Sequence, residues 1–556
     1  MEIDHSRIDP VRSSHGEIEN HVIDEFLAGR LSRREFLRRG SIVGISIPAL
    51  GAIVAACGGA NSSSSSSTSA ATGGAQKSPG TLKIAGTVPA AAIDPITVED
   101  EGGLTMLQQS GEYLVLDNPQ TFQVNPMLAT SWTPNSDGTE WTFKLRPNVK
   151  FHNGKTMTAD DVVYTFKQQS NPNGKGNALS VYTGLLTPDG VSKVDDMTVK
   201  FSLEAAVGSF PYLISTDNYN AIIVPKGTDF AGWEKTFQGT GPFVLQNYTA
   251  KQGATFTANP HWWKGAVGPK TVVWTFYATQ PPQILALQGG QVDAINDIAY
   301  QGAQALFNSP SYKIIDDHTS QHRELSMRCD QPPFNDSRVR QAIALTLDRP
   351  AIANALFGKY AQIGNDSPFA PIFPSTDKSV PQRHQDLVQA KQLLKSAGHP
   401  NGFSATLYTE NYQELPQLAQ IVKESASKIG VNLTLNVSDQ NTYYSKYWLT
   451  GEMSLVDYGH RGVPNVFLNA TLTSKGSWNA AHFKNSQYDN LYKQYVAAVD
   501  LGTQRRLARQ IQTLLLAQTP IIIPYFFDEL SATKPTLGGI VTTGMGQMFA
   551  GQAYSM

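Results

Sequence analysis

Short runs in which apolar and polar residues alternate recur along the chain from residue 81 onward. Thr81 to Ala85 and Trp141 to Leu145 alternate in this way, and the second run follows the turn sequence Asn135-Ser136-Asp137-Gly138. Val431 to Val437 alternates strictly. Because successive side chains of a strand point to opposite faces of a sheet, these runs predict β-strands that each have one buried face.

Apolar residues at helical spacing predict helices between further strands, and several of these segments start at Pro and stop at Gly. The predicted helices are 158–166, 281–288, 337–347, 351–357, 387–397, 415–429 and 505–518, and the further strands are 272–277, 292–295 and 521–523. Helices that alternate with apolar strands indicate an α/β fold in which helices cover most of each sheet.

Two adjacent carboxylates, Asp160 and Asp161, open the helix predicted at 158–166. Paired carboxylates are typical of general acid–base chemistry. However, Thr158 at the N-cap with Asp161 three residues later is close to a capping box, and acids in the first turn suit the helix dipole. We therefore interpret the pair as a structural helix start.

The segment Ser32 to Cys57 has the layout of an export signal. Arg33 and Arg34 precede an apolar run, Ile42 to Ala56, which is shorter than the roughly twenty residues that a transmembrane helix needs. The phrase S-R-R-x-F-L resembles a twin-arginine signal. Val54-Ala55-Ala56-Cys57 resembles a lipobox, whose cysteine is acylated and becomes the mature N-terminus. The alternative is a basic helix flank followed by a chance cysteine.

These features predict a signal peptide at 1–56 and a flexible Ser- and Gly-rich tether at 57–80. The remaining chain is long enough to form more than one lobe. If Cys57 is acylated, Cys329 has no partner for a disulfide. We expect a protein that is held by lipid at the outer face of the cell membrane.

Composition and motifs exclude several classes of function. The formal net charge of −2 gives no support for nucleic-acid binding, which needs a basic face. The chain has no G-x-S-x-G or H-E-x-x-H motif, and His318, His322 and His482 lack a metal-ligand spacing. We therefore predict no catalytic residue, no metal and no cofactor. A secreted hydrolase with dispersed carboxylates stays open as an alternative.

Five phrases that occur in a fixed order carry a resemblance to a known family. They are Pro126 to Trp132, Trp141 to Phe166, Gly239 to Phe243, Leu287 to Asp293, and Pro333-Phe334-Asn335-Asp336 with Val339 to Ala342. Together they resemble the extracytoplasmic solute-binding lipoproteins of ABC importers, family 5, which includes dipeptide-, oligopeptide- and nickel-binding proteins. The resemblance covers the chain from about Thr81 to its end.

The resemblance implies a two-lobed periplasmic-binding-protein-like fold of type II, with an extra subdomain, that closes on a ligand without catalysis. Lobe I would comprise 81–317 and 528–556, with the subdomain at about 126–235, and lobe II would comprise 318–527. The hinge would lie near Gln321–Arg328 and Pro524–Asp528. The implied partners are a small-molecule ligand and the ABC permease subunits with their ATPases, and we expect a monomer. A receptor that feeds a sensor is a second alternative.

The resemblance also suggests where the ligand binds. In peptide-binding members, the segment that matches Asp457 to Phe467 carries an aspartate for the α-ammonium of the peptide; here His460 stands at that place and Arg461 follows it. Neither side chain supplies a negative charge, so an anionic or polyhydroxyl ligand is favoured unless Asp457 restores the acid or Arg461 points to solvent. The candidate ligand-binding residues are His460, Arg461, Asp457, Gly462, Tyr412, Trp478, Asn479, Thr87 and Tyr113.

Overall fold

The computed structural model describes residues 77–556. The predicted signal peptide with Arg33 and Arg34, the acylation site Cys57 and all but the last residues of the tether lie outside this range. Within residues 77–556, no helix is both long enough and apolar enough to cross a membrane.

The first of two large sheets is built from lobe I residues and has seven strands in the order β12-β20-β11-β1-β10-β9-β8. Its strands are β1 (Thr81–Thr87), β8 (Phe243–Thr249), β9 (Gly253–Ala258), β10 (Thr271–Tyr277), β11 (Ala294–Ile295), β12 (Lys313–Asp317) and β20 (Glu529–Thr533). Strand β1 pairs in parallel with both β10 and β11, whereas β20 runs antiparallel to β11 and β12. The C-terminal part of the chain therefore completes the sheet that its first strand begins.

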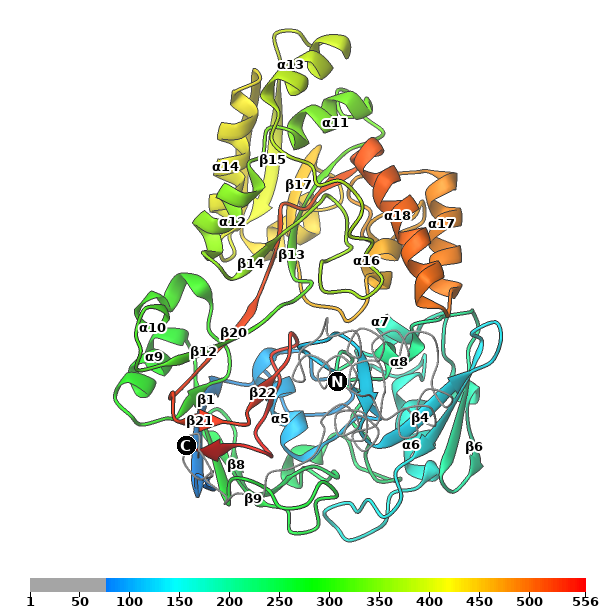
Figure 1. The fold of residues 1–556 in the computed structure, drawn as a ribbon, viewed down its shortest axis with the longest axis vertical. Helices are drawn as coiled ribbons and strands as arrows, with labels where there is room; N and C mark the ends of the chain where they lie inside the picture. The colour runs from blue at the N-terminus through cyan, green and yellow to red at the C-terminus, as the bar shows by residue number, and fades with distance from the viewer. Residues whose placement is uncertain (1–76) are drawn as a thin grey trace, which may run out of the picture. The chain divides into compact units, whose positions relative to one another are not determined.

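The second large sheet is built from lobe II residues in the order β14-β19-β13-β17-β15-β16, and β18 also pairs with β13. Its strands are β13 (His322–Met327), β14 (Ala361–Ile363), β15 (Phe403–Glu410), β16 (Val431–Ser438), β17 (Met453–Tyr458), β18 (Ile521–Ile522) and β19 (Tyr525–Phe527). In Figure 1 this sheet and its helices fill the upper part of the picture, above the lobe I sheet.

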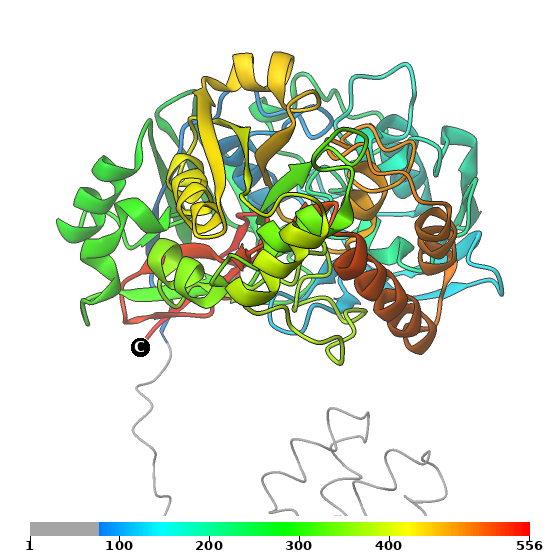
Figure 2. The ribbon, with the colours of Figure 1, turned by 90° about the horizontal axis from the view of Figure 1, so that it is seen from above.

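Helices surround both sheets. In lobe II they are α11 (Ser337–Ala344), α12 (Arg349–Phe357), α13 (Leu387–Ser396), α14 (Leu415–Ser427), α15 (Gln440–Thr442), α16 (Asn465–Ala470), α17 (Ser486–Ala497) and α18 (Leu501–Gln518). Helix α14 packs along β15 and β16, and α17 lies beside α18, as Figure 2 also shows. In lobe I they are α5 (Glu101–Ser110), α7 (Leu179–Tyr182), α8 (Phe210–Leu213), α9 (Gln280–Gln288) and α10 (Gln304–Phe307).

A smaller sheet of four strands, in the order β4-β5-β7-β6, forms a subdomain of lobe I. Its elements are β4 (Ala129–Pro134), β5 (Glu140–Leu145), β6 (Val191–Asp195), β7 (Thr198–Ser202) and helix α6 (Ala159–Gln169). The buried rings of Phe143, Phe166 and Phe201 meet in its core. Short pairs, β2 (Val115–Asp117) with β3 (Val124–Pro126), β21 (Leu537–Gly538) with β24 (Tyr554–Ser555), and β22 (Val541–Thr542) with β23 (Met548–Phe549), complete lobe I.

The chain passes between the two large sheets at two places. The first passage is residues 318–321, upstream of most of the expected Gln321–Arg328, because His322–Met327 is strand β13 inside the lobe II sheet. The second passage is Asp528, between β19 and β20. The passages are tied side by side, since His318 Nδ1 lies 2.9 Å from Asp528 Oδ1 and the Thr319 hydroxyl donates to the carbonyl of Phe527 at 2.6 Å.

The predicted α/β organisation is confirmed, and so are the helices and strands named from the pattern, with ends that shift by a few residues. The capping box at the start of α6 is also confirmed: the backbone N–H of Thr158 donates to Asp161 Oδ2 at 2.8 Å. Asp161 is therefore occupied in holding the helix start.

Candidate functional site

A cavity of about 420 Å³ lies where the two lobes face each other. Lobe I contributes Glu101, Asp297 and Glu529, and lobe II contributes Tyr412, His460 and Arg461. The second passage, Asp528, also lines it. A cavity whose walls come from both lobes and from a connecting segment changes shape whenever the lobes move, which is the geometry that a ligand-gated hinge requires.

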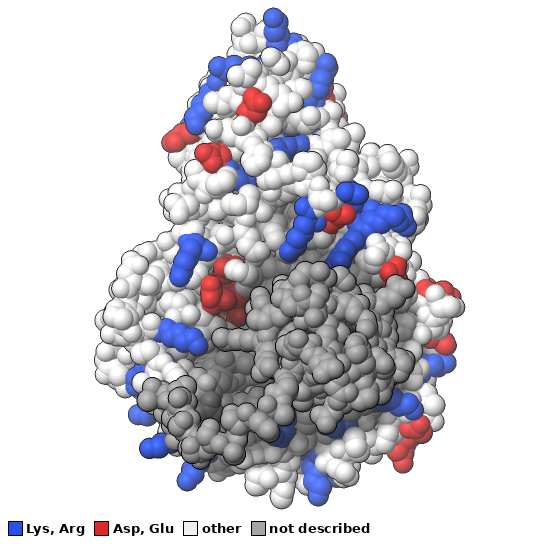
Figure 3. Space-filling model, in the orientation of Figure 1, with Lys and Arg blue, Asp and Glu red and all other residues white. Residues whose placement is uncertain are grey.

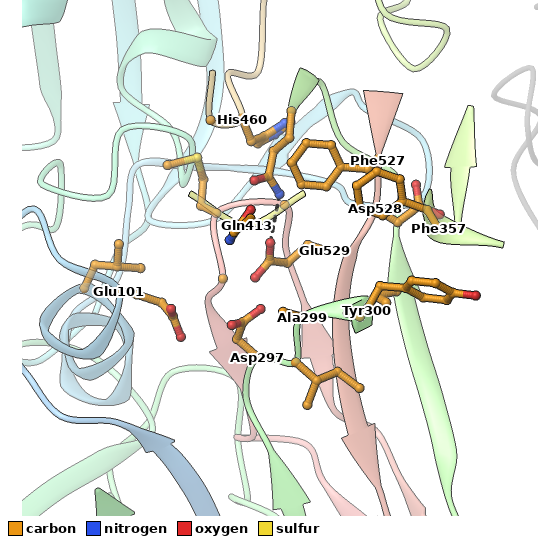
Figure 4. A pocket seen from close by; sticks show the side chains of 18 of the residues that line it. Glu101, Asp297, Ala299, Tyr300, Phe357, Gln413, His460, Phe527, Asp528 and Glu529 are labelled. Atoms are coloured by element: carbon orange, nitrogen blue, oxygen red, sulfur yellow. Dashed lines mark hydrogen bonds between the residues drawn. The ribbon is translucent and has the colours of Figure 1, made fainter. Parts of the chain in front are cut away.

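Three carboxylates of lobe I, which we call the carboxylate cluster, face this cavity: Glu101, Asp297 and Glu529 (Figure 4). Glu101 is the first residue of α5, whose N-cap is Asp100. Asp297 follows β11 and Glu529 begins β20, and the antiparallel pairing of these two strands brings residues that are far apart in the sequence to the same edge.

The acids of the carboxylate cluster hydrogen-bond one another, Glu101 with Asp297 and Asp297 with Glu529, and two neighbouring side chains add further donors. The Thr87 hydroxyl donates to Glu101 Oε1 at 3.2 Å, and the Gln321 amide donates to Glu529 Oε2 at 2.8 Å. Burial, with the charge of Asp297, raises the pKa of Glu101 to about 8. Burial, with the charge of Glu101, raises the pKa of Glu529 to about 7, and burial beside Glu529 raises the pKa of Asp297 well above its usual range.

His460 and Arg461 follow strand β17 on the opposite side of the cavity. His460 is buried, and its Nδ1 accepts the backbone N–H of Ser320 at 3.0 Å, so the neutral ring carries its proton on Nε2. Nε2 lies 3.7 Å from Asp217 Oδ1 of lobe I. His460 therefore joins the lobes and is held by protein groups on both sides of its ring.

Arg461 lines the cavity, and burial lowers its pKa. Its Nη1 donates to the carbonyl of His460 at 2.7 Å, and its backbone N–H donates to Ser320 Oγ at 2.8 Å. Within residues 77–556 no carboxylate oxygen lies within 4.0 Å of its guanidinium nitrogens. The cavity lining thus has one guanidinium on its lobe II side, and its lobe I side carries the carboxylate cluster together with exposed Glu99.

Asp457 is placed away from the cavity lining, in an ionic network inside lobe II. Arg323 Nη1 lies 3.9 Å from Asp457 Oδ2, and the Tyr444 hydroxyl oxygen, which has one proton to donate, lies 2.9 Å from both Asp457 Oδ1 and Glu410 Oε1. The same Arg323 donates to Glu414 Oε1 at 2.6 Å. Asp457 therefore serves as a counter-ion for a buried arginine.

Of the remaining predicted residues, only Tyr412 lines the cavity, where burial raises its pKa to about 12. Thr87 does not line the cavity, but its hydroxyl donates a hydrogen bond to Glu101, which does. Tyr113 is buried and donates to the carbonyl of Tyr219 at 3.1 Å. Ligand contact by these residues stays a prediction.

Gly462, Trp478 and Asn479 lie off the lining. A side chain at Gly462 would collide with the carboxylate of Asp217, so this glycine permits the close approach of the lobes there. Trp478 stacks on Tyr458 with ring centroids 5.8 Å apart, and the Asn479 amide donates to the carbonyls of Thr473 and Phe483. These contacts indicate that Trp478 packs against another ring and that Asn479 stabilises a loop.

Sequence reasoning missed the carboxylate cluster and the aromatic residues Tyr300, Phe357 and Phe527, which also line the cavity. The only local signal was Asp100-Glu101, an acid pair that fits an N-cap and first turn. Nothing local marks Asp297 or Glu529, because their proximity depends on the pairing of β11 with β20.

Among residues 77–556, no group of three or more His, Cys, Asp or Glu side chains is arranged to hold a metal ion. On the face shown in Figure 3, the acidic and basic side chains of the described residues are interspersed over lobe II.

Comparisons with known proteins agree with this architecture. Residues 123–479 match the family model of bacterial extracellular solute-binding proteins, family 5. Among curated proteins, a heme-binding protein A of Haemophilus influenzae is 27% identical over 470 residues, which are 79% of this chain and 85% of that protein. A glutathione-binding protein of Pectobacterium atrosepticum is 25% identical over 467 residues, 81% of this chain and 89% of that protein.

Solved structures show the same fold. The structure of HbpA2 from Haemophilus parasuis covers 86% of this chain and 100% of its own, with a TM-score of 0.77 and 23% identity. A nickel ABC transporter structure from Bacillus halodurans covers 85% of this chain and 99% of its own, with a TM-score of 0.72 and 22% identity. The chain therefore belongs to family 5 of the bacterial extracellular solute-binding proteins and is the solute-binding component of an ABC importer.

Proposed function

We propose that the chain captures a small polar solute in the cavity between its lobes and presents it, with the lobes closed, to a membrane permease with its ATPases. The observation that carries the proposal is the composition of the cavity wall, which takes charged side chains from both lobes. A solute that contacts both walls binds the closed arrangement more tightly than an open one, and that difference in affinity drives closure.

The two passages between the sheets supply the hinge. In this proposal residues 81–317 and 528–556 move as lobe I, and residues 318–527 move as lobe II. The contacts between His318 and Asp528, and between Thr319 and the carbonyl of Phe527, keep the two passages together during the motion. Only a few backbone dihedral angles then have to change, while both sheets stay rigid.

Contacts across the lobes away from the cavity support a discrete closed state. The Asn465 amide of lobe II donates to Ser209 Oγ of lobe I at 2.9 Å. The backbone N–H of Gly208 donates to the carbonyl of Val496, also at 2.9 Å. Together with His460 and Asp217, these contacts form on closure and are exchanged for water on opening.

Small-angle X-ray scattering tests closure. Protein purified without denaturation is first analysed by native mass spectrometry to identify the solute that it carries, and that solute is then added back to stripped protein. We expect a smaller radius of gyration with the solute, and the solute recovered chemically unchanged. An unchanged radius at saturation would contradict the hinge, and a converted solute would instead favour an enzyme.

We also propose that the protein is a monomer and that it is exported through a twin-arginine route. After export, lipid on Cys57 would anchor it outside the cytoplasm. Support comes from the order of Arg33, Arg34, the apolar run and Cys57 in the sequence. Cys57→Ala is expected to release the protein from the membrane fraction, and Arg33→Lys with Arg34→Lys is expected to block export. Unchanged fractionation of both variants would remove this part of the proposal.

A further inference from the structure

A second cavity lies within lobe I, between the end of helix α5 and residues 539–552. Its volume is about 110 Å³, and we call it the lobe I pocket. Helix α5 contributes Gln108, and the C-terminal part of the chain contributes Val541 and Phe549. The lobe I pocket shares no lining residue with the cavity between the lobes, so it is a separate site.

The lobe I pocket extends from the surface to a buried floor. Lys264, Val541 and Gln552 are exposed, whereas Gln108 and Glu112 are only 1% and 2% exposed. A molecule that enters past the exposed residues therefore meets buried polar groups. All lining residues belong to lobe I, so access to this pocket does not depend on the hinge.

Gln108 is the residue on this floor that lacks hydrogen bonds. Both polar atoms of its amide, Oε1 and Nε2, are buried without a partner among residues 77–556. Because a buried amide without hydrogen bonds is costly, such groups usually face a partner. The lobe I pocket thus presents one acceptor and one donor, side by side, to its occupant.

Glu112, the other buried polar side chain of the floor, already has its hydrogen bonds. Its carboxylate accepts from Trp262 Nε1 at 3.0 Å, Trp263 Nε1 at 2.7 Å and Thr240 Oγ1 at 2.8 Å. The unmet hydrogen-bonding capacity of the pocket therefore belongs to Gln108. Since Gln108 is neutral, it favours a neutral ligand, whereas an ion would lose its hydration without gaining a counter-ion there.

The rest of the wall around Gln108 is largely apolar. The ring of Trp262 is buried, that of Phe549 is half-buried, and Leu116 and Met127 lie beside them in the lining. An apolar cavity of about 150 Å³ holds a benzene molecule, so this smaller pocket suits a ring of about five or six atoms. Size and lining together indicate a small ligand with one apolar side and one amide-like edge.

We propose that the lobe I pocket binds a small neutral amide, either a lactam ring or a primary carboxamide. The N–H of the ligand donates to Gln108 Oε1, and its carbonyl accepts from Gln108 Nε2. Its carbon atoms pack against the rings of Trp262 and Phe549. This ligand is distinct from the solute of the proposed function, and its binding does not require the lobes to close.

Two molecules of the same shape test the hydrogen bonding. 2-Pyrrolidinone and cyclopentanone both have a five-membered ring with a carbonyl, but only the lactam has an N–H beside it. In saturation-transfer NMR titrations of the purified protein, we expect 2-pyrrolidinone to bind about tenfold more tightly, as one well-placed hydrogen bond predicts. Equal affinity would overturn the proposal. So would no binding of 2-pyrrolidinone at tens of millimolar, which would mean that water alone occupies the pocket.

Variants assign the binding to this pocket. Gln108→Met keeps a side chain of similar length without the amide, so we expect 2-pyrrolidinone to lose its advantage over cyclopentanone. Gln288→Met is the matched control, because Gln288 is an exposed residue of α9 that does not line the pocket. The same loss in the control would contradict the assignment to Gln108.

A second variant blocks the mouth of the pocket and leaves its floor intact. Val541 is 40% exposed, so Val541→Trp places a large ring at the entrance without disturbing the core. We expect both probes to bind at least tenfold more weakly to this variant. Unchanged binding by Gln108→Met and Val541→Trp would place the probes elsewhere and overturn the proposal.

Small-angle X-ray scattering distinguishes this site from the solute site of the proposed function. Saturating 2-pyrrolidinone should leave the radius of gyration unchanged, because the lobe I pocket lies within one lobe. Compaction by 2-pyrrolidinone would place it between the lobes and would contradict the second site.

Discussion

Two buried acidic sites, one in each lobe, are built in opposite ways. In lobe II, Asp366 is fully buried and lies between two arginines, with Arg349 Nη2 at 2.7 Å from both carboxylate oxygens and Arg383 Nη1 at 2.5 Å. In lobe I, the three carboxylates of the cluster meet at the cavity without an arginine or lysine among the described residues. The fold thus supplies two arginines to Asp366, whereas the described residues supply no arginine or lysine to the three acids of the cluster.

A third buried acid shows that lobe I can satisfy a carboxylate when the fold requires it. Glu112 is 2% exposed and accepts hydrogen bonds from Trp262 Nε1 at 3.0 Å, Trp263 Nε1 at 2.7 Å and Thr240 Oγ1 at 2.8 Å. The contrast with the cluster is therefore not a property of the lobe as a whole. It is not a simple matter of facing the cavity either, because buried Glu324 of lobe II lies off the cavity lining and has an oxygen without a hydrogen-bond partner.

The largest effect should follow from breaking the paired site in lobe II. Arg349→Ala removes a guanidinium that is 1% exposed and leaves Asp366 with one partner, so we expect a loss of about 3 kcal/mol or more in the free energy of unfolding. Urea denaturation measures this loss. The control is Arg338→Ala, whose guanidinium is 47% exposed and pairs with Asp336, for which we expect less than about 1 kcal/mol. Equal losses in the two variants would refute the distinction.

The same Glu→Gln substitution in lobe I should affect the free energy of unfolding differently at the two kinds of site. Glu112→Gln places an amide N–H₂ among donors and loses charge-assisted hydrogen bonds, so we expect the free energy of unfolding to fall by about 1.5–3 kcal/mol. Glu529→Gln removes charge from the unpaired cluster and should leave the ligand-free protein as stable as before or more stable at pH 8. The comparison fails if both variants lose similar stability in urea denaturation.

More of the fold than of the candidate site could be predicted from the sequence. Strict alternation marked β16, and Thr158 with Asp161 marked the start of α6, because both signals are local. Helix α5, which carries Glu101, was not predicted, since Gly102 and Gly103 weaken helical propensity and packing against Thr87, Val88 and Pro89 compensates. Tertiary contacts therefore determine that this segment forms a helix.

The candidate site depended even more on long-range contacts. His460, Arg461 and Tyr412 line the cavity, and ligand contact by them stays a prediction. Asp457 instead lies 3.9 Å from buried Arg323. The charge of the opposite wall was not predicted, because all of lobe II separates Asp297 from Glu529 in the sequence and the two meet only through strand pairing. A sequence shows an acid but not which cation, if any, the fold brings to it.

A further expected effect is a pH dependence of stability that belongs to the cluster. The pKa values of Glu101 and Glu529 rise from 4.5 in a free side chain to about 8 and about 7, chiefly through burial. Between pH 4.5 and 8 the folded protein therefore binds more protons at these groups than the unfolded chain does. The stability that this proton binding gives is fully present below pH 4.5 and is lost as pH rises through the folded-state pKa values.

The measurement is the melting temperature of ligand-free protein between pH 5 and 9. We expect the cluster to make this temperature fall by a few degrees as the pH rises. Buried Glu324 in lobe II, whose pKa burial raises to about 8, contributes a slope of the same sign, so the difference between variants isolates the cluster. The double variant Glu101→Gln, Glu529→Gln should show a flatter profile, and Glu324→Gln should remove only its own share. If the double variant keeps the full slope, the two carboxylates are not the unpaired acids that distinguish the cavity from the arginine-bound Asp366.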